Sequence, residues 1–570
     1  MPLPIVSTGK WLAKNELVIP KVAMPVSPIY DATKQYMLTM GEFEHRFHPD
    51  MSPVRVFGYN GTYPGPTIVA KTNEAVRINW FNGLEGKSLD SLISFGVRQG
   101  MEEDHMLEKP HHVVHVHGAR VPATSDGFPH HFSHPNEGHL YYYPNKQAAS
   151  TLWYHDHAMD VTRLNVYAGL CGMYLLRGDG EAFLPSGKQE IPLVLQDKSF
   201  TEDGSQLYYE QEYDKEKAKN DPNYTATPEF VGQFPVVNGQ IWPRASVAPR
   251  VYRLRILNGA NTRIFNLSFC EEGDPGKKIN FHVIGTEGGF LKESVAAKTL
   301  LMAPGERFDV LLDLRKHNNK NIILHNSHPD ILDHRKENFA QLLQFAVKGK
   351  ALASDEKHFL SWPIKLPARK EPVLPPGAPP NEIDTMDFAA IEAAADQVPM
   401  LSLKSGFTVQ THSFVFRRFV LEEYMLPVNT KPGLLTPTVL VNGGNWGNTP
   451  PIEIKSLGYE VWEFLNTTKD VHPMHVHLVQ FMPLSRTGIE FVPATGDPVD
   501  PPMPKAIGFK YLNRSKIPPH ENGWKDTIQC KPNEATRIIM RFDGYRGNYI
   551  YHCHILEHED MGMMFNIKID

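Results

Sequence analysis

The sequence has little cysteine: four residues in a chain of 570. So few cysteines exclude the disulfide scaffold on which small secreted domains depend. There is also no basic surplus, because 58 Lys and Arg stand against 64 Asp and Glu, a formal charge of −6. That balance argues against a nucleic-acid partner. No run of 18 apolar residues occurs, so we expect no membrane-spanning helix.

A secretion signal is missing from the first twenty residues, MPLPIVSTGKWLAKNELVIP. A signal peptide has a basic start followed by an apolar core, and neither is present. If Met1 is the natural start, the chain is expected to remain unsecreted.

Long helical periodicity is scarce, and short apolar stretches are separated by Pro, Gly and Asn. This pattern is typical of strands and predicts an all-β protein. A length of 570 residues leaves room for three or four domains.

An internal repeat is visible three times. An Asn-Gly turn is followed 22, 20 or 24 residues later by the Asn that ends a strand-like segment. The turns and closing residues are Asn60-Gly61 with Asn82, Asn238-Gly239 with Asn258, and Asn442-Gly443 with Asn466. Three ordered copies predict three β-sandwiches, over residues 1–185, 186–350 and 401–570. A linker is expected over 351–400, Pro-rich from Ser361 to Pro380 and ending in one short helix within 384–397.

Four His-x-His pairs lie in strand-like segments. They are His115/His117, His155/His157, His475/His477 and His552/His554. Residues i and i+2 of a strand point to the same face, so each pair can offer two imidazoles to one site. Eight neutral imidazoles suit copper, zinc, iron or nickel. Two pairs belong to the first repeat and two to the third, which predicts a shared cluster between these repeats. The second repeat is expected to be a spacer.

The segment YHCHILEHEDMGMM, residues 551–564, holds a second set of ligands. Cys553 lies between two histidines and therefore faces the opposite side of the strand. His558, Met563 and the upstream His472 complete a set of two His, one Cys and one Met, which is the ligand set of a blue-copper site. The alternative is a buried free Cys beside a chance Met. The backbone of Cys553 would join this site covalently to the histidine cluster.

These motifs resemble those of three-domain multicopper oxidases. Four motifs occur in the family's order: HVHG, WYHDH, HPMHVH and HCHILEHEDMGMM. Two further segments, SDGFP and TRLNVYAGL, are most similar to the spore-coat laccase and bilirubin oxidase branch, with phenoxazinone synthase a close relative. The resemblance implies three cupredoxin-like Greek-key β-sandwiches and four copper ions. The implied ligands are His472, Cys553, His558 and Met563 for type 1 copper, His115 and His475 for type 2, and His117, His155, His157, His477, His552 and His554 for the type 3 pair.

The resemblance also implies the reaction. A small reducing substrate such as a phenol, an aminophenol or bilirubin would lose electrons singly at type 1 copper, and O2 would be reduced to water at the other three. Asp126 and Glu559 match acidic residues that deliver protons. Asp126 could instead only form a Ser-Asp-Gly turn, and Glu559 could be a solvated acid. Trp446 and His558 are expected at the substrate face, although Trp446 could be a core indole. A monomer, cytoplasmic or associated with a spore coat, is expected.

Other functions remain open from the sequence. A metallo-oxidase of Fe(II) or Cu(I) would place an acidic or Met-rich patch beside type 1 copper, and a copper-carrying coat protein would show only incidental activity. A zinc hydrolase does not explain Cys553, and no HExxH motif is present. Of the other cysteines, Cys171 is expected to be a buried free thiol, while a bridge between Cys270 and Cys530 is undecided.

Overall fold

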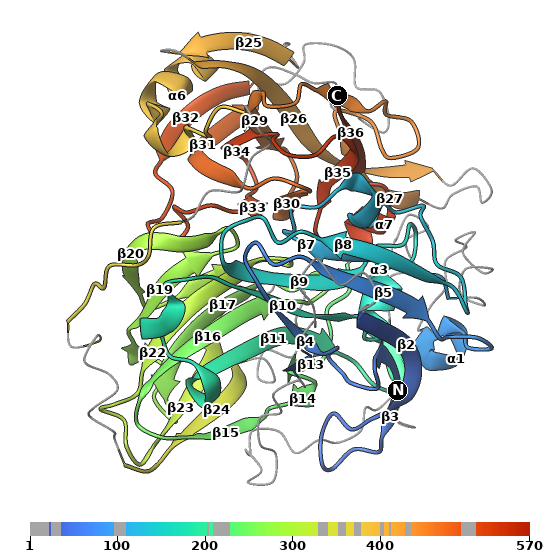
Figure 1. Ribbon diagram of the computed structural model, residues 1–570, viewed down its shortest axis with the longest axis vertical. Helices are drawn as coiled ribbons and strands as arrows, with labels where there is room; N and C mark the ends of the chain where they lie inside the picture. Colours follow the sequence, from blue (N-terminus) through green and yellow to red (C-terminus); the bar gives the residue numbers. More distant parts are fainter. Residues whose placement is uncertain are drawn as a thin grey trace.

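The structure is a computed structural model that describes residues 22–23, 36–95, 110–201, 205–208, 229–328, 340–350, 359, 361–369, 378–398, 404–409, 412–427, 435–491 and 509–570. Strands dominate and the helices are short (Figure 1), which confirms the all-β prediction. No helix in these ranges has the length and apolar character needed to cross a membrane. The N-terminal twenty residues and much of the expected linker lie outside the described residues.

Two sheets pack face to face in the N-terminal part of the chain, blue to cyan in Figure 1. They enclose a core that includes Leu38, Trp80 and Tyr154. One sheet has the order β1 (Val22–Ala23), β4 (Thr67–Lys71), β10 (Cys171–Arg177), β9 (Ser150–Asp156), β7 (Val114–His117). The other has the order β3 (Val54–Tyr59), β2 (Tyr36–His45), β5 (Val76–Asn82), β8 (Gly138–Tyr143). We call this pair of sheets the first sandwich.

The second sandwich, green in Figure 1, has a core that includes Leu254, Phe308 and Phe345. One sheet has the order β14 (Gln240–Ile241), β13 (Phe234–Val237), β11 (Glu190–Lys198), β16 (Val251–Asn258), β22 (Arg307–Asp313), β19 (Phe281–Thr286), β20 (Gly289–Ala297). The other has the order β15 (Arg244–Val247), β24 (Gln341–Val347), β23 (Lys320–Asn326), β17 (Phe265–Glu271), β18 (Lys278–Ile279), with β21 (Leu300–Met302) paired to β17.

The third sandwich, orange to red in Figure 1, has a core that includes Trp462, Met474 and Cys553. Its larger sheet has the order β25 (Lys404–Val409), β26 (His412–Pro427), β29 (Tyr459–Asn466), β34 (Glu534–Arg541), β31 (Phe481–Phe491), β32 (Phe509–Ser515), with β27 (Leu435–Val441) paired to β26. The smaller has the order β28 (Ile452–Ile454), β36 (Met564–Ile569), β35 (Gly547–Cys553), β30 (His472–Val476), β33 (Thr527–Cys530).

The remaining elements are short. They are the helices α1 (Leu89–Leu92), α3 (Thr162–Ala168), α6 (Phe388–Asp396) and α7 (Leu556–Asp560), and the paired strands β6 (Ile93–Phe95) and β12 (Gln206–Tyr208).

The repeat seen in the sequence has the same backbone role in each sandwich. The Asn of each Asn-Gly turn has a positive φ, 51°, 49° and 53° in chain order, as does the Gly that follows it. Asn tolerates this left-handed conformation and Gly adopts it freely. The Asn that closes each repeat is fully buried, and its side-chain amide donates to two backbone carbonyls from two different segments of the chain. These three residues are Asn82, Asn258 and Asn466.

The helix expected near the end of the linker is present as α6. Asp387 caps it by accepting hydrogen bonds from the backbone N–H groups of Ala389 and Ala390. Its residue Ile391 packs in the same cluster as Phe416 of the third sandwich. This end of the predicted linker is therefore fastened to the third sandwich.

All four cysteines are buried and free. The undecided bridge between Cys270 and Cys530 is absent, since Cys270 lies in β17 of the second sandwich and Cys530 in β33 of the third. Cys171 is a buried thiol as predicted, and burial raises its pKa to about 12.

Candidate metal centre

Strand register brings the four His-x-His pairs together. On β7 and β9 His115 lies opposite His155, and on β30 and β35 His475 lies opposite His552. Opposite residues of an antiparallel pair share a face. The first and third sandwiches therefore each present four imidazoles to the space between them.

The eight imidazoles form three groups, and each group draws on both sandwiches. In every group the ligand atoms lie within 4.8 Å of one another. The groups are His115, His117 and His475; His117, His155 and His554; and His157, His477 and His552. Rings from the two sandwiches also stack, His115 on His477 at 3.8 Å and His117 on His475 at 3.6 Å between centroids.

Hydrogen bonds on the outer ring nitrogens fix which nitrogen faces inward. Nδ1 of His115, His155 and His475 each donates to a backbone carbonyl, at 2.6, 2.7 and 2.7 Å. Their Nε2 atoms are buried and have no hydrogen-bond partner among the described residues. His117 is reversed, since its Nε2 is bound by Asp526 and Thr527 and its Nδ1 is unpartnered.

Seven of the eight cluster histidines favour the neutral form, because burial lowers their pKa, to about 3 for His155 and for His475. A neutral imidazole with its outer N–H bonded presents a lone pair inward. Several such lone pairs converging in a buried space are costly unless a metal ion accepts them. The eight histidines therefore fit a metal cluster of copper, zinc, iron or nickel type.

A second group lies on the other face of β35. Cys553 Sγ lies 3.5 Å from His472 Nδ1 and 3.7 Å from His558 Nδ1, and the two Nδ1 atoms are 3.3 Å apart. His472 Nε2 is held by Thr468 at 2.8 Å, so its Nδ1 is the free ligand atom. These distances suit three ligands around one ion.

Met563 lies beside this group. Its backbone carbonyl accepts from Cys553 N and its N–H donates to the His558 carbonyl, at 3.0 and 2.9 Å. Its side chain is fully buried in the core cluster that contains Cys553. Gly562, with a φ of 92°, turns the chain from α7 back into β36. Two His, one Cys and one Met fit copper better than zinc.

Both predicted acids contact the histidine cluster. Asp126 Oδ2 lies 2.8 Å from His477 Nδ1, and burial raises the pKa of Asp126 well above its ordinary value. Glu559 lies 3.2 Å from His157 Nδ1 and 3.1 Å from His552 Nδ1. Glu559 is only 1% exposed, so it is no solvated acid. Each carboxylate touches histidines on the outer side of the cluster.

The Nε2 face of His558 meets carboxylates that the sequence did not reveal. Glu229 lies 3.2 Å and Glu423 lies 3.9 Å from His558 Nε2. Burial, with the neighbouring Asp470 and Glu229, raises the pKa of Glu423 to about 7. No motif links these residues, which come from segments far apart in the chain. The ring of Trp446 stacks on His130, with 5.6 Å between centroids, and its backbone N–H donates to the Gly562 carbonyl.

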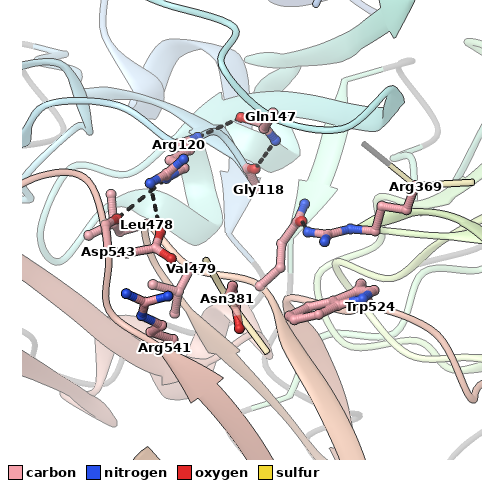
Figure 2. Close-up of a pocket in the computed structure, with 11 residues that line it drawn as sticks. Gly118, Arg120, Gln147, Arg369, Asn381, Leu478, Val479, Trp524, Arg541 and Asp543 are labelled. Carbon is pink, nitrogen blue, oxygen red and sulfur yellow. Dashed lines mark hydrogen bonds and ion pairs between the residues drawn. The ribbon is translucent and has the colours of Figure 1, made fainter. Parts of the chain in front are cut away.

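A polar pocket with a volume of about 20 Å³ is lined in part by Gly118 and Leu478, the residues that follow His117 and His477 in the chain (Figure 2). Three arginines and Asp543 also line it, and Arg120 donates to Asp543 at 2.6 Å.

The second sandwich, expected from the sequence to be a spacer without copper ligands, contacts the cluster from outside. Gly305 packs so tightly on His554 that a Cβ there would lie 2.8 Å from the imidazole Cδ2. Arg307 makes two hydrogen bonds to Asp526, the acceptor for His117. A sequence pattern based on His pairs could not detect Gly305 or Arg307, because these residues contact the histidines or their hydrogen-bond partners and are not themselves possible ligands.

Comparison with known proteins gives a consistent result. Multicopper oxidase family models match residues 44–106, 103–181 and 419–570. The chain is 36% identical to a laccase of Bacillus stratosphericus and 34% identical to a laccase of Bacillus subtilis, covering 96% of this chain and 97% of each relative. A crystal structure of the McoA multicopper oxidase from Aquifex aeolicus matches with a TM-score of 0.67 at 23% identity, over 98% of this chain and 100% of that chain.

Proposed function

The chain belongs to the multicopper oxidase family and is a copper oxidoreductase of laccase type that uses O2, and from that premise we propose its copper sites and the roles of its residues. We propose four copper ions. Type 1 copper takes His472, Cys553, His558 and Met563, type 2 takes His115 and His475, and the type 3 pair takes His117, His155 and His554 on one side and His157, His477 and His552 on the other. The convergence of unpartnered imidazole nitrogens supports this assignment.

When bound, copper supplies one-electron oxidation of the donor at Cys553 and reduction of O2 at the histidine cluster. The protein supplies the connection between the two sites. Cys553 is joined through its own backbone to His552 and His554, which gives electrons a covalent path of one residue in either direction. His552 Nδ1 also lies 3.0 Å from the Cys553 carbonyl, a second contact along the same path.

Protons for water formation require groups that reach the cluster from outside it. Asp126 and Glu559 are proposed as these groups, because each carboxylate lies within 3.2 Å of a cluster imidazole. Burial raises the pKa of Asp126 well above its ordinary value, which favours the protonated form that a proton donor needs. The arginine-lined pocket beside Gly118 is the proposed route for solvent.

The substrate is proposed to be a small phenol, aminophenol or bilirubin-like donor that approaches the Nε2 edge of His558, with Trp446 nearby on the Gly562 turn. Three cupredoxin domains over residues 1–185, 186–350 and 401–570 are proposed to form a monomer, since every proposed ligand comes from one chain.

One experiment tests these assignments. Copper-loaded protein should contain four copper ions per chain, show the blue absorption of a Cys-ligated site, and give distinct type 1 and type 2 EPR signals. Oxygen uptake should follow addition of an aminophenol or bilirubin, and sedimentation should give a mass of one chain. Fewer than four copper ions with full activity would contradict the ligand assignment.

A second candidate function is oxidation of Fe(II). It is favoured by the carboxylates of Glu229, Glu423 and Asp470 around His558, since hard carboxylate oxygens bind such cations. Glu423→Gln should then raise the KM for Fe(II) and leave the KM for an aminophenol unchanged. Equal effects on both donors, or no Fe(II) oxidation by the wild type, would reject this candidate.

A further inference from the structure

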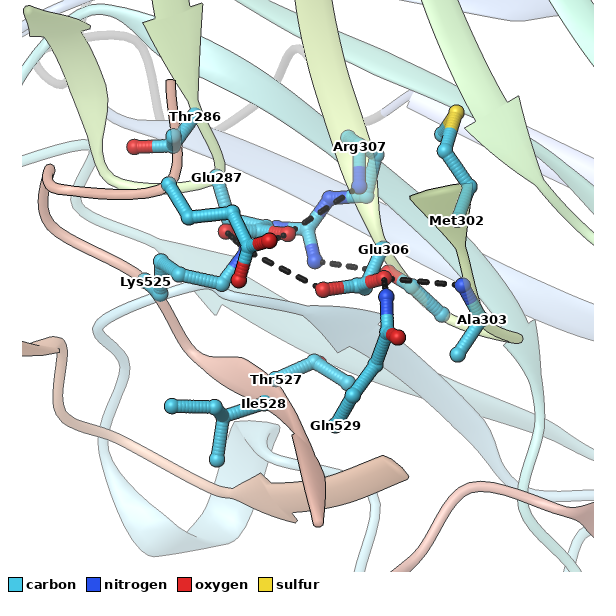
Figure 3. Close-up of polar contacts among 12 residues, drawn as sticks. Thr286, Glu287, Met302, Ala303, Glu306, Arg307, Lys525, Thr527, Ile528 and Gln529 are labelled. Carbon is cyan, nitrogen blue, oxygen red and sulfur yellow. Dashed lines mark hydrogen bonds and ion pairs between the residues drawn. The ribbon is translucent and has the colours of Figure 1, made fainter. Parts of the chain in front are cut away.

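Buried charges join the second sandwich to the third (Figure 3). Lys525 Nζ lies 2.9 Å from Glu287 and 3.2 Å from Glu306, and Arg307 donates to the two oxygens of Asp526 at 2.7 and 2.6 Å. All five side chains are fully buried. Charges are buried at such cost only when they are paired and hydrogen-bonded, which these are.

Asp526 connects this network to two cluster histidines. Its Oδ1 lies 3.0 Å from His117 Nε2, and its backbone carbonyl accepts from His475 Nδ1 at 2.7 Å. The two histidines come from different sandwiches, and their rings stack on each other. A single residue therefore sets the orientation of one imidazole from each half of the cluster.

The orientation of Asp526 depends on Arg307, whose guanidinium donates to Oδ1 and Oδ2 at 2.7 and 2.6 Å. Oδ1 in turn accepts the Nε2–H of His117, which leaves Nδ1 of that ring as the inward-facing ligand atom. The planar guanidinium of Arg307 bonds both oxygens of Asp526 and so also fixes the plane of the carboxylate. The ammonium group of a lysine, which acts as a single point charge, cannot do this.

The glycine of the HVHG motif is explained by the same contact. A Cβ on Gly118 would lie 2.4 Å from Asp526 Oδ2 and 2.6 Å from an Arg307 terminal nitrogen. The φ of this residue is +86°, which L side chains rarely adopt. The first sandwich thus leaves open the space in which the second and third sandwiches form their ion pair.

We propose that Arg307, which lies in the sandwich without copper ligands, is a positioning residue of the type 2 and type 3 sites and acts through Asp526 on His117 and His475. The inference rests on the proposed copper sites. It gives the second sandwich a role in metal binding beyond that of a structural spacer, because its strand β22 supplies the cation that orders ligands of the other two.

The test compares Arg307→Gln and Arg307→Lys with a matched control, Arg253→Gln. Arg253 is equally buried on the second sandwich, and its fork also binds a carboxylate in two places, but that carboxylate is Asp309, away from the histidines. The readouts are copper content after competition with a chelator, the type 2 EPR signal, the blue absorption band and the Tm.

Arg307→Gln should retain the blue band, bind cluster copper 10- to 100-fold more weakly and show an altered type 2 signal. Arg307→Lys should fold with its charge intact and still alter the type 2 signal, because lysine cannot hold both carboxylate oxygens. Arg253→Gln should lower the Tm without changing either copper signal.

The proposal is overturned if Arg307→Lys gives the wild-type type 2 signal and copper affinity. This outcome decides the matter whether or not Arg307→Gln folds. It is also overturned if Arg253→Gln changes the type 2 signal to the same extent. Failure of the proposed copper sites themselves would look different, since the wild type would then lack a type 2 signal.

Discussion

Replacing Glu559 by Gln tests whether this acid delivers protons or only holds two histidines in place. The carboxylate lies 3.2 Å from His157 Nδ1 and 3.1 Å from His552 Nδ1, one imidazole from each half of the cluster. Gln has the same shape, keeps one carbonyl acceptor, and cannot release a proton. We expect Glu559→Gln to keep four copper ions and the blue band while O2 reduction slows.

The size of the effect separates the two roles. If Glu559 only positions the rings, Gln loses the attraction of the carboxylate charge for two imidazoles, taken as no more than one charge-assisted hydrogen bond, ~1.5–3 kcal/mol, or roughly 10- to 150-fold in rate. A proton donor contributes about 10²- to 10⁴-fold. A loss near 10³-fold that also removes an ionisation from the pH–rate profile therefore indicates proton delivery, and a loss below about 100-fold with an unchanged profile indicates positioning.

The matched control is Glu557→Gln. Glu557 lies on the same helix α7 and is also buried, but its carboxylate accepts hydrogen bonds from Tyr208, Asn261 and Thr262 and contacts no cluster histidine. Stopped-flow measurement of reoxidation by O2, after full reduction of each variant, isolates the step. Reoxidation at the wild-type rate across pH in Glu559→Gln, or equal slowing in both variants, would refute the reasoning.

Three further predictions follow from the same structure. Cys553→Ser should abolish the blue absorption while the histidine cluster keeps its copper; a surviving blue band would contradict the type 1 assignment. Gly118→Ala should lower the free energy of unfolding in urea by more than Gly61→Ala, because both have positive φ but only at Gly118 would the new Cβ meet Asp526 Oδ2, at 2.4 Å; equal losses would show that the clash is relieved. Burial lowers the pKa of Lys198 to about 7, so between pH 7 and 10.5 the unfolded chain binds a proton that the native chain does not, and stability should rise with pH. Lys198→Met should remove that rise in urea titrations at several pH values, and an unchanged slope would count against it.

The sequence by itself determined the fold class and the residues that converge. Alternation on a strand repeats every two residues, so His-x-His pairs and the intervening Cys553 could be assigned to opposite faces without a structure. The Asn-Gly turns indicated three copies because Asn and Gly are the residues that adopt positive φ at low cost. Both signals are local, and local geometry is fixed by residue type and spacing.

Only the tertiary structure decided what surrounds these residues. Arg307 and Asp526 are 219 positions apart, and Glu229 reaches His558 from a segment more than 300 residues away. Neither contact leaves a periodic trace in the sequence, because it depends on how the packed sandwiches meet. The role proposed for the second sandwich could not be predicted from the sequence for the same physical reason: it carries none of the proposed ligands, and Arg307 contacts the cluster only through Asp526 of the third sandwich.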